Sequence, residues 1–346
     1  MMNLLSKLIF LLKKPKVVVV TGEGRACATE AISQVLRQYF RIGEEILIFE
    51  SEDKELRKFE FFLKRSQKAV LVVTQAGDIP YDQDFFSGEK EKIKGTLGLV
   101  KTLPAQINLI LNFDDETIRE IADVTNLNTL TFGFQERSDF RASDVRLNSG
   151  TNFKINYKGN IVPVWLGKLF GKEQIYSALS VTAVGTIFDL NLVEISQALK
   201  NYHSLPGKMR LVRGIKSSWV LDDSESATVF SMTEAIEILG KLPGFKRRIA
   251  VLGDVIGIGK YTIEAHEAMG ERIAKNADLL FTFGPRARFI AQGAQQKGMA
   301  LEKIFQFATI DEGKLKLQAE IKTGDIILVD GSKEMEIGRI VEEIKT

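Results

Sequence analysis

The stretch VVVVTGEGRACATEAI, residues 17–32, decides the fold class of the first half of the chain. Four consecutive valines predict a buried strand, the two glycines predict a tight turn, and the alanine-rich run predicts a helix. A strand, a glycine turn and a helix start together favour phosphate binding, because the first N–H groups of the helix point toward the anion. We therefore expect a nucleotide phosphate site at Gly22, Gly24 and Arg25.

Two side chains of this loop differ from those that hold a triphosphate in a P-loop. Such a loop ends in Gly-Lys and then Ser or Thr, where the lysine reaches the β- and γ-phosphates and the hydroxyl binds Mg²⁺. Here the run is Gly24-Arg25-Ala26, and Thr29 is the next hydroxyl along the helix. Arginine can contact a phosphate, but its rigid fork does not reach as lysine does. The alternative is a strand-to-helix turn that needs glycine only for its backbone conformation.

Composition narrows the class of protein. A chain of 346 residues, 45% hydrophobic and 27% charged, is typical of a globular protein with two domains or three. The net charge of +2 gives no indication of a nucleic-acid partner. The single cysteine, Cys27, excludes an internal disulfide framework and fits the reducing cytoplasm. Two histidines, His203 and His266, leave little material for a histidine metal site.

The first 16 residues, MMNLLSKLIFLLKKPK, predict a short amphipathic helix that packs on the first strand. The apolar run is too short to span a bilayer, and it has neither the basic start nor the cleavage site of a signal peptide. The alternative is a weak contact with a membrane surface, helped by Lys13, Lys14 and Lys16.

Short apolar runs alternate with amphipathic segments in both halves, which predicts α/β domains with mostly parallel sheets. The expected strands are 17–20, 45–49, 69–73, 108–111, 218–221, 248–252, 279–283 and 325–329. The expected helices are 28–40, 54–65, 116–124, 172–188, 192–201, 231–242, 263–276, 285–297 and 334–345. Polar turns between short strands predict an antiparallel annex over residues 127–163. With a boundary near 203–207, we expect an N-terminal helix (1–16), a central domain (17–204) and a C-terminal domain (205–346).

The second half carries a series of short motifs that indicate a family. They are PGKMR (206–210), LDDS (221–224), SMTEA (231–235), RIAVLGD (248–254) and DIILVDGSK (325–333), with His266 on a helix between the last two. In this order and spacing they resemble the C-terminal domain of the Mur ligases. The most similar branch is the one that adds D-alanyl-D-alanine to UDP-MurNAc-tripeptide.

The first half resembles the ATP-binding central domain of the same family. The loop at residues 21–32 takes the place of the family's P-loop, and Leu111–Asp115 resembles the segment whose Asn and Asp contact adenine. Residues 171–179, GKEQIYSAL, resemble the family's G-x-H-N-x-x-N-A-L helix start. The resemblance implies a P-loop-like central domain followed by a Rossmann-like C-terminal domain.

The resemblance also implies a reaction and a set of site residues. Mur ligases form an amide by phosphorylating a carboxylate with ATP and Mg²⁺, after which an amine attacks the acyl phosphate. By this likeness Asn112 and Asp115 hold adenine, and Lys94 matches the family lysine that, when carbamylated, helps to bind a second metal. Three further residues line the cleft between the domains: Asp222, His266 and Lys333. The implied partners are a UDP-MurNAc-peptide precursor and another Mur-pathway protein, and the implied location is the cytoplasm.

The chain also departs from the family pattern. Thr74 and Gln75 stand where the family has a Glu that binds Mg²⁺, and residues 82–94 lack the segment that carries a second metal-binding His. We assign no metal ligand, and we expect the separate N-terminal UDP-sugar domain to be absent. The lost groups all serve phosphoryl transfer, which favours a second hypothesis, a non-catalytic homologue that binds a nucleotide, a precursor or a partner ligase.

Each site residue also has a structural interpretation that the sequence leaves open. Asn112 and Asp115 could close a strand and cap the helix at Glu116. Asp222 could support a loop, His266 could be an ordinary helix residue, and Lys333 could be solvated.

Overall fold

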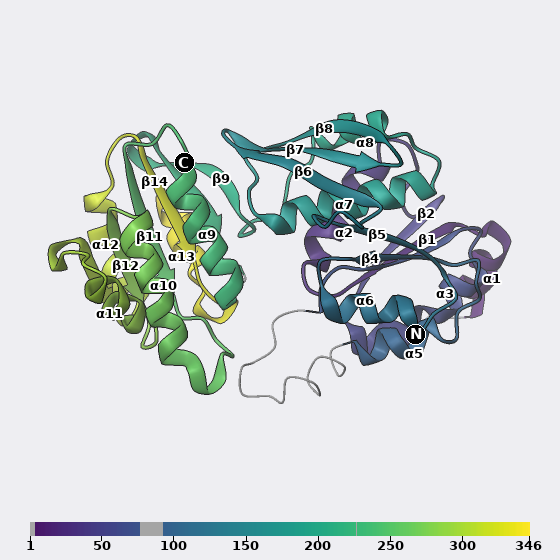
Figure 1. The fold of residues 1–346 in the computed structure, drawn as a ribbon, viewed down its shortest axis with the longest axis horizontal. Coiled ribbons are helices and arrows are strands. Elements are labelled where there is room, and N and C mark those ends of the chain that lie inside the picture. Colours follow the sequence, from purple (N-terminus) through teal and green to yellow (C-terminus); the bar gives the residue numbers. More distant parts are fainter. Residues whose placement is uncertain (1–3, 77–92, 226) are drawn as a thin grey trace.

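The chain folds as two α/β domains, each built on one twisted sheet (Figure 1). The structure is a computed structural model that describes residues 4–76, 93–225 and 227–346, with side chains from residue 8 onward. The division falls between the last helix of the first sheet and the first strand of the second. The α/β class with parallel sheets predicted from the sequence is confirmed.

The central domain contains an eight-stranded sheet in the order β2-β1-β3-β4-β5-β6-β7-β8. Its parallel part comprises β1 (Lys16–Thr21), β2 (Ile46–Ser51), β3 (Ala69–Val73), β4 (Asn108–Asn112) and β5 (Asn128–Gly133). The four valines of β1 alternate between two cores because successive side chains of a strand point to opposite faces. Val18 and Val20 pack in one core, and Val17 and Val19 in the other.

Helices cover both faces of this sheet. One face carries α2 (Arg25–Leu36), α7 (Lys172–Ile187) and α8 (Leu192–Leu199), and the other carries α3 (Glu60–Arg65), α5 (Lys94–Val100) and α6 (Glu116–Asp123). Burial on both faces explains why these strands are continuous apolar runs in the sequence.

The annex predicted for residues 127–163 is partly wrong. The strands β6 (Phe140–Leu147), β7 (Gly150–Tyr157) and β8 (Asn160–Gly167) are antiparallel to one another. However, β5 is parallel to β4, and β6 joins β5 in parallel through the pair Phe132 and Phe140. Both rings are buried in the same core as Val18, so this segment extends the main sheet.

The C-terminal domain contains a six-stranded sheet in the order β13-β12-β11-β14-β10-β9. Its strands are β9 (Arg210–Gly214), β10 (Ser218–Asp223), β11 (Arg247–Gly253), β12 (Leu279–Phe283), β13 (Ile304–Phe307) and β14 (Asp325–Asp330). Only β9 is antiparallel to its neighbour among the paired strands described. The helices are α9 (Val229–Lys241), α10 (Thr262–Asn276) and α11 (Arg288–Gln296) on one face, with α12 (Ile310–Glu320) and α13 (Gly338–Ile344) on the other.

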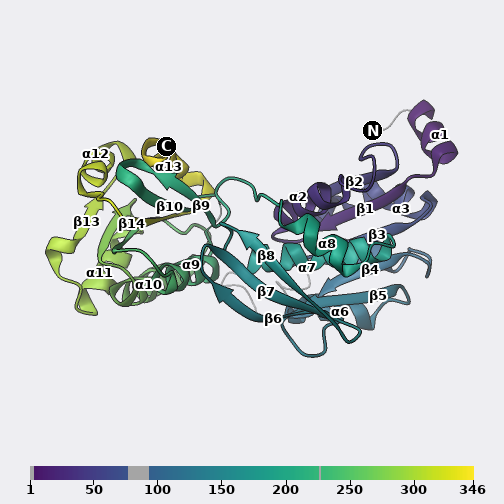
Figure 2. The ribbon, with the colours of Figure 1, turned by 90° about the horizontal axis from the view of Figure 1, so that it is seen from above.

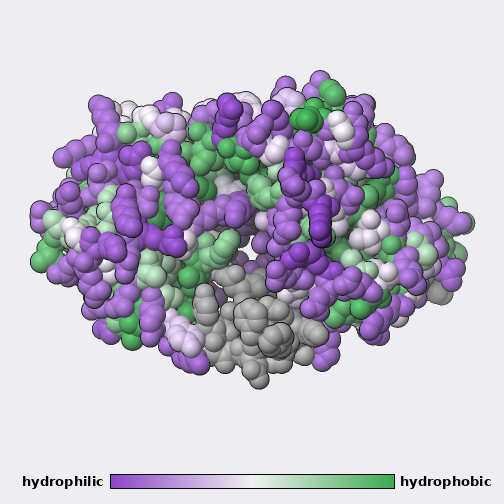
Figure 3. All heavy atoms as spheres, in the orientation of Figure 1, coloured by the Kyte–Doolittle hydropathy of each residue, from purple (hydrophilic) through white to green (hydrophobic). Residues whose placement is uncertain are grey.

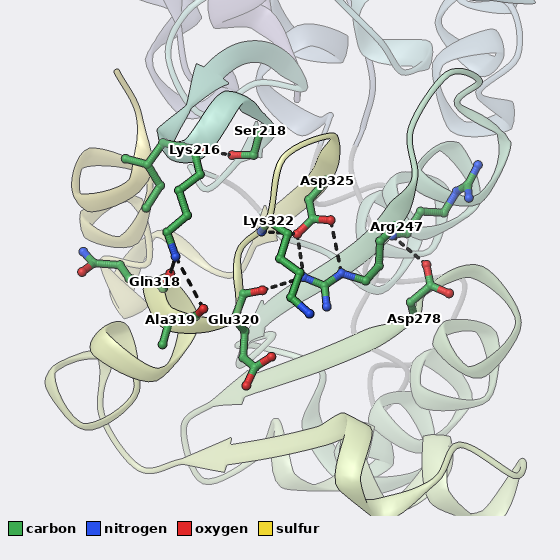
Figure 4. Close-up of polar contacts among 11 residues, drawn as sticks. Lys216, Ser218, Arg247, Asp278, Gln318, Ala319, Glu320, Lys322 and Asp325 are labelled. Carbon is green, nitrogen blue, oxygen red and sulfur yellow. Dashed lines mark hydrogen bonds and ion pairs between the residues drawn. The ribbon is translucent and has the colours of Figure 1, made fainter.

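Cationic side chains fix the C-terminal end of α12 to this sheet (Figure 4). Arg247 on β11 donates to both carboxylate oxygens of Asp325, at 3.2 and 2.7 Å, and to the Glu320 carbonyl at 2.5 Å. Lys216 donates to the Gln318 carbonyl at 2.7 Å. Positive charge at the end of a helix satisfies carbonyls that have no partner within the helix.

The N-terminal helix α1 (Leu4–Lys13) lies at the end of the central domain far from the C-terminal domain (Figures 1 and 2). Phe10 is buried against Phe61 and Phe62 of α3, in the core that also contains Val17. Within the described chain, no helix is both long and apolar enough to cross a membrane.

Candidate functional site

The glycine loop lies where ligands bind in open parallel sheets. β1 pairs with β2 on one side and with β3 on the other, so the chain winds in opposite directions from this point. Loops at the carboxyl ends of strands at such a switch point form a crevice. Gly22 and Gly24 have φ angles of 99° and 76°, which a residue with a side chain rarely adopts.

The polar groups of this loop are bonded within the protein. The Glu23 N–H donates to the Gln75 carbonyl at 2.8 Å, so it does not face a phosphate. Arg25 donates to the Gly22 carbonyl at 3.2 Å and pairs with Glu50 on β2, with Nε and Oε1 3.1 Å apart. The guanidinium that replaces the P-loop lysine is therefore held by a carboxylate and by its own loop.

The described side chains around the loop differ from those that hold a triphosphate with Mg²⁺ in a P-loop. The Thr74 hydroxyl bonds to the Thr21 carbonyl at 2.9 Å and also contacts the Glu23 carbonyl. The Glu173 side chain lies over Gly24, where a Cβ would meet its Cγ at 3.4 Å. Among the described residues, no group of three or more His, Cys, Asp or Glu side chains is placed to hold a metal ion. These residues do not fit a γ-phosphate with Mg²⁺, because Thr74 offers no carboxylate to the metal and the negative charge of Glu173 beside Gly24 repels phosphate oxygens.

The end of the site expected to hold adenine retains one donor. Asn112 ends β4, and its Oδ1 accepts from the Asp114 N–H at 3.0 Å. Its Nδ2 is buried and has no hydrogen-bond partner in the described structure. A buried amide without a partner is costly, so this group fits a ligand acceptor. Asp115 instead caps α6 through the Ile118 N–H and accepts from the Ala76 N–H.

Thr29 is the substitute hydroxyl expected on the loop helix. It lies in the second turn of α2, and its Oγ1 is buried without a hydrogen-bond partner among the described residues, as is the Thr21 Oγ1 at the end of β1. Both hydroxyls belong to the strand and helix that flank the glycine turn, so unsatisfied polar atoms remain under the loop.

Asp222 holds the linker between the domains. Its carboxylate accepts from the Gly207 N–H at 2.8 Å and from the Ser224 hydroxyl at 2.7 Å. The adjacent Asp223 accepts from the Met209 N–H at 3.1 Å, and burial raises the pKa of Asp223, with the Asp330 charge adding to the effect. The two aspartates therefore fix the chain where the C-terminal domain begins.

His266 and Lys333 lie in different surroundings. His266 is buried, accepts from the Val255 N–H at 3.2 Å through Nε2, and has Nδ1 2.6 Å from the Thr262 carbonyl. Burial lowers the pKa of His266. Lys333 is exposed, with its Nζ 3.6 Å from Glu225. His266 thus supports the loop at residues 254–262, whereas Lys333 lies beside Glu225 on the surface. The prediction that Asp222, His266 and Lys333 line the cleft is wrong, because other residues line it.

Lys94 begins α5 on the surface. The next two residues, Gly95 and Thr96, donate backbone N–H groups to the Asp53 carboxylate, which fixes this helix start. Most of the segment where the metal-binding His of the family is missing, residues 82–92, lies outside the described residues.

A cleft of about 1280 Å³ separates the two domains next to the glycine loop. The central domain contributes Glu23, Phe134 and Leu147, and the C-terminal domain contributes Phe230 and Ile256. Hydrophobic and hydrophilic residues both border the hollow between the two lobes in Figure 3. A pocket between two domains with an apolar lining and a few polar groups is a usual place for a small-molecule site.

Both halves of the chain match one protein family. Residues 29–185 match the Mur ligase middle domain, and residues 207–333 match the Mur ligase, glutamate ligase domain. The chain belongs to the Mur ligase family.

Curated relatives place this Mur ligase near one branch. It is 23% identical over 303 residues to the UDP-N-acetylmuramoyl-tripeptide–D-alanyl-D-alanine ligase of Bacillus subtilis, covering 87% of this chain and 64% of the relative. The enzyme of the same name from Escherichia coli is 28% identical over 210 residues, covering 60% of this chain and 45% of the relative. The chain therefore resembles the MurF branch but spans less than two thirds of these relatives.

Solved structures agree on the fold. MurF from Acinetobacter baumannii superimposes with a TM-score of 0.81 at 16% identity, covering 98% of this chain and 78% of that structure. MurF ligase from Thermotoga maritima, in complex with ADP, superimposes with a TM-score of 0.76 at 20% identity. The match covers 97% of this chain and 81% of that structure.

Sequence reasoning missed a polar cluster in this Mur ligase that joins the glycine loop to the interdomain linker. Gln174 on α7 donates to the Ser204 hydroxyl at 2.8 Å and to the Lys208 carbonyl at 3.0 Å, and it accepts from Tyr202 at 3.1 Å. Cys27 lies 3.7 Å from Ser204, and burial raises the pKa of its thiol. Cys27 is therefore a small packing residue, as a reactive thiol needs a lowered pKa.

A second missed group fills the space beside Asn112. Asp114 accepts from the N–H groups of Phe134 and Gln135, at 2.7 and 3.1 Å, and from the Tyr176 hydroxyl at 3.1 Å. Burial raises the pKa of Tyr176, and the Asp114 charge adds to this effect. Asp114 precedes Asp115, which the resemblance assigns to adenine, but the partners of Asp114 come from the segment after β5 and from α7.

Proposed function

We propose that the chain serves the step of peptidoglycan-precursor synthesis in which D-alanyl-D-alanine is joined to UDP-MurNAc-tripeptide. The observation that carries this proposal is the pairing of both Mur ligase domains around a cleft of about 1280 Å³. The similarity to curated relatives with this activity supports it. The single buried cysteine supports a cytoplasmic location.

The chemistry of the step divides the site into two parts. An acid–amino-acid ligase must bind the precursor and must also neutralise the phosphate that activates the carboxylate. The cleft suits the binding of the precursor, and the Asn112 amide, which has no partner among the described residues, suits the adenine of a nucleotide. The ion pair between Arg25 and Glu50, together with Glu173 over Gly24, opposes the phosphate part. We therefore expect weak use of ATP.

The loop geometry favours a second candidate function, a non-catalytic homologue. In this form the chain binds the precursor or another Mur-pathway protein and acts as a scaffold or regulator in cell-wall synthesis. A partner protein would then supply the nucleotide chemistry. The specific observation is that the Glu23 N–H, the Arg25 guanidinium and the Thr74 hydroxyl are all bonded inside the protein.

One set of measurements tests both candidates. Calorimetric titrations with UDP-MurNAc-tripeptide and with ATP plus Mg²⁺ measure binding, and ADP release in the presence of D-alanyl-D-alanine measures turnover. Turnover supports the ligase. Precursor binding without turnover supports the non-catalytic form. If the precursor does not bind and no ADP forms, the proposed function is overturned.

A further inference from the structure

Among the described side chains of helix α1, residues 8–13, Phe10 is the one that is buried. Phe10 is 5% exposed, and its ring centroid lies 5.0 Å from that of Phe62 and 5.8 Å from that of Phe61. At roughly 100° per residue, the four large aliphatic residues of this turn and the next occupy an arc of about 160° centred opposite Phe10. They are Leu8, Ile9, Leu11 and Leu12, which are 55%, 46%, 37% and 77% exposed.

This aliphatic face is an unusual surface for a globular domain. Single exposed apolar side chains are common, but a contiguous patch indicates an interaction surface. The face lies at the far end of the central domain from the cleft (Figures 1 and 2), so it has no part in the site described above. Within the described residues, it remains open to solvent.

Basic residues border the aliphatic face. Lys13 and Lys14 are exposed at the end of α1. The Gln67 N–H donates to the Pro15 carbonyl at 3.3 Å, which holds the end of α3 beside this segment and brings the exposed Arg65 near it. Residues 1–22 contain four lysines and no Asp or Glu. The segment that carries the aliphatic face is therefore positively charged.

We propose that α1 docks the protein on an anionic membrane surface. The aliphatic face enters the boundary between headgroups and acyl chains, while Lys13, Lys14 and Arg65 lie against lipid phosphates. A helix with an apolar face and a basic border binds in this way, and each basic residue near the surface adds to the attraction. One helix with four aliphatic contacts gives weak and reversible binding, which leaves the cleft free at the opposite end of the molecule.

A vesicle experiment with matched variants tests the docking. The full chain is sedimented with vesicles of phosphatidylcholine alone and with vesicles that also contain phosphatidylglycerol. We expect binding to the second kind, weakened by high salt because salt screens exposed charges. Leu12→Asp should reduce the affinity on the order of tenfold, since a charge replaces an inserted aliphatic group. Lys13→Glu with Lys14→Glu should remove the preference for phosphatidylglycerol.

Leu315→Asp is the matched control because Leu315 is 69% exposed on α12 of the other domain. It should bind vesicles as the unmodified chain does, and circular dichroism checks that all variants are folded. Failure of the unmodified chain to bind anionic vesicles overturns the proposal. The proposal is also overturned if Leu315→Asp lowers the affinity for vesicles as much as Leu12→Asp does. A third contrary outcome is that the unmodified chain does not bind vesicles but forms a dimer in light scattering that Leu12→Asp dissociates. The test uses neither precursor nor ATP, so its outcome is independent of the proposed function.

Discussion

Among the residues of the loop, Arg25 differs most in its chemistry from what a P-loop requires, because a lysine is expected at its position. Its Nε lies 3.1 Å from Glu50, so its charge is turned toward β2. We predict that Arg25→Lys combined with Ala26→Thr strengthens the binding of ATP with Mg²⁺ by about tenfold, or roughly 1.4 kcal/mol. The lysine regains the reach of a P-loop lysine, and the threonine supplies a hydroxyl for the metal. Calorimetric titration measures the change.

Glu50→Gln is the control for this double variant, because it releases Arg25 without adding a lysine or a hydroxyl. It should bind ATP more weakly than the double variant does. An unchanged affinity in the double variant would mean that Glu23 and Glu173, rather than the two substituted positions, keep phosphate out of the loop.

His266 should make stability depend on pH. Nε2 accepts a hydrogen bond from Val255, so the buried ring is neutral, and burial lowers its pKa. An unfolded histidine has a pKa of about 6.5, so the unfolded chain binds the proton first as the pH falls. This contribution to stability is complete above about pH 6.5 and is lost as the pH falls through the lower native pKa.

Thermal unfolding of the unmodified chain and of His266→Gln between pH 5 and pH 8 measures this contribution. The midpoint difference between the two proteins should shrink as the pH falls below about 6.5. His203→Gln, at an exposed position of the linker, is the matched control and should follow the unmodified chain. A constant difference across the range would show that protonation of His266 does not affect folding.

At the scale of elements, the end of α12 depends on a partly buried ion pair. The Arg247 side chain is 22% exposed and that of Asp325 is 2% exposed, with a shortest N–O distance of 2.7 Å. We predict that Arg247→Met lowers the free energy of unfolding by about 3 kcal/mol, because it leaves a buried carboxylate without its partner. Arg339→Met removes the exposed pair with Asp311 and should cost less than about 1 kcal/mol. Urea denaturation distinguishes the two, and equal losses would contradict the argument from burial.

The individual strands and helices also show how much of the structure the sequence predicts. The strands β3 and β12 were predicted to the residue, because each is a continuous apolar run that is buried throughout. The helix α12 was missed, since only Ile310, Gly313 and Leu317 are buried and the pattern lacks an apolar stripe. Helix α6 also has only three buried residues but was predicted, so the apolar stripe rather than the number of buried residues makes a helix recognisable.

The candidate site could be predicted only in part for a related reason. The glycine turn is local, so its position at the end of β1 follows from the sequence. The partners that decide its chemistry are not local: Glu50 comes from β2 and Glu173 from α7. No pattern in residues 17–32 indicates which carboxylates will surround the loop.

At the scale of the whole molecule, a side chain of the central domain is buried in the core of the C-terminal domain. Phe170 lies between β8 and α7 of the central domain, yet it is fully buried in the core formed by α9 to α11. Its N–H donates to the Met209 carbonyl at 3.0 Å. We predict that Phe170→Ala lowers the free energy of unfolding by about 3–5 kcal/mol and loosens the linker. Trypsin should then cut faster after Lys208 and Arg210. Calorimetry would measure the loss of stability, and mass spectrometry would identify the cleavage sites.

Phe132→Ala provides the control for this prediction, because Phe132 is equally buried but lies within the central sheet. Both substitutions should lower the unfolding temperature, since each leaves a cavity. Only Phe170→Ala should raise the rate of cleavage in the linker relative to the rate elsewhere, because Phe170, unlike Phe132, packs in the core of the C-terminal domain. If both variants raise it equally, global unfolding exposes the linker, and the domains are not held together by Phe170. A selective effect would mean that Phe170, next to the aspartates that hold Gly207 and Met209, helps to hold the two domains together.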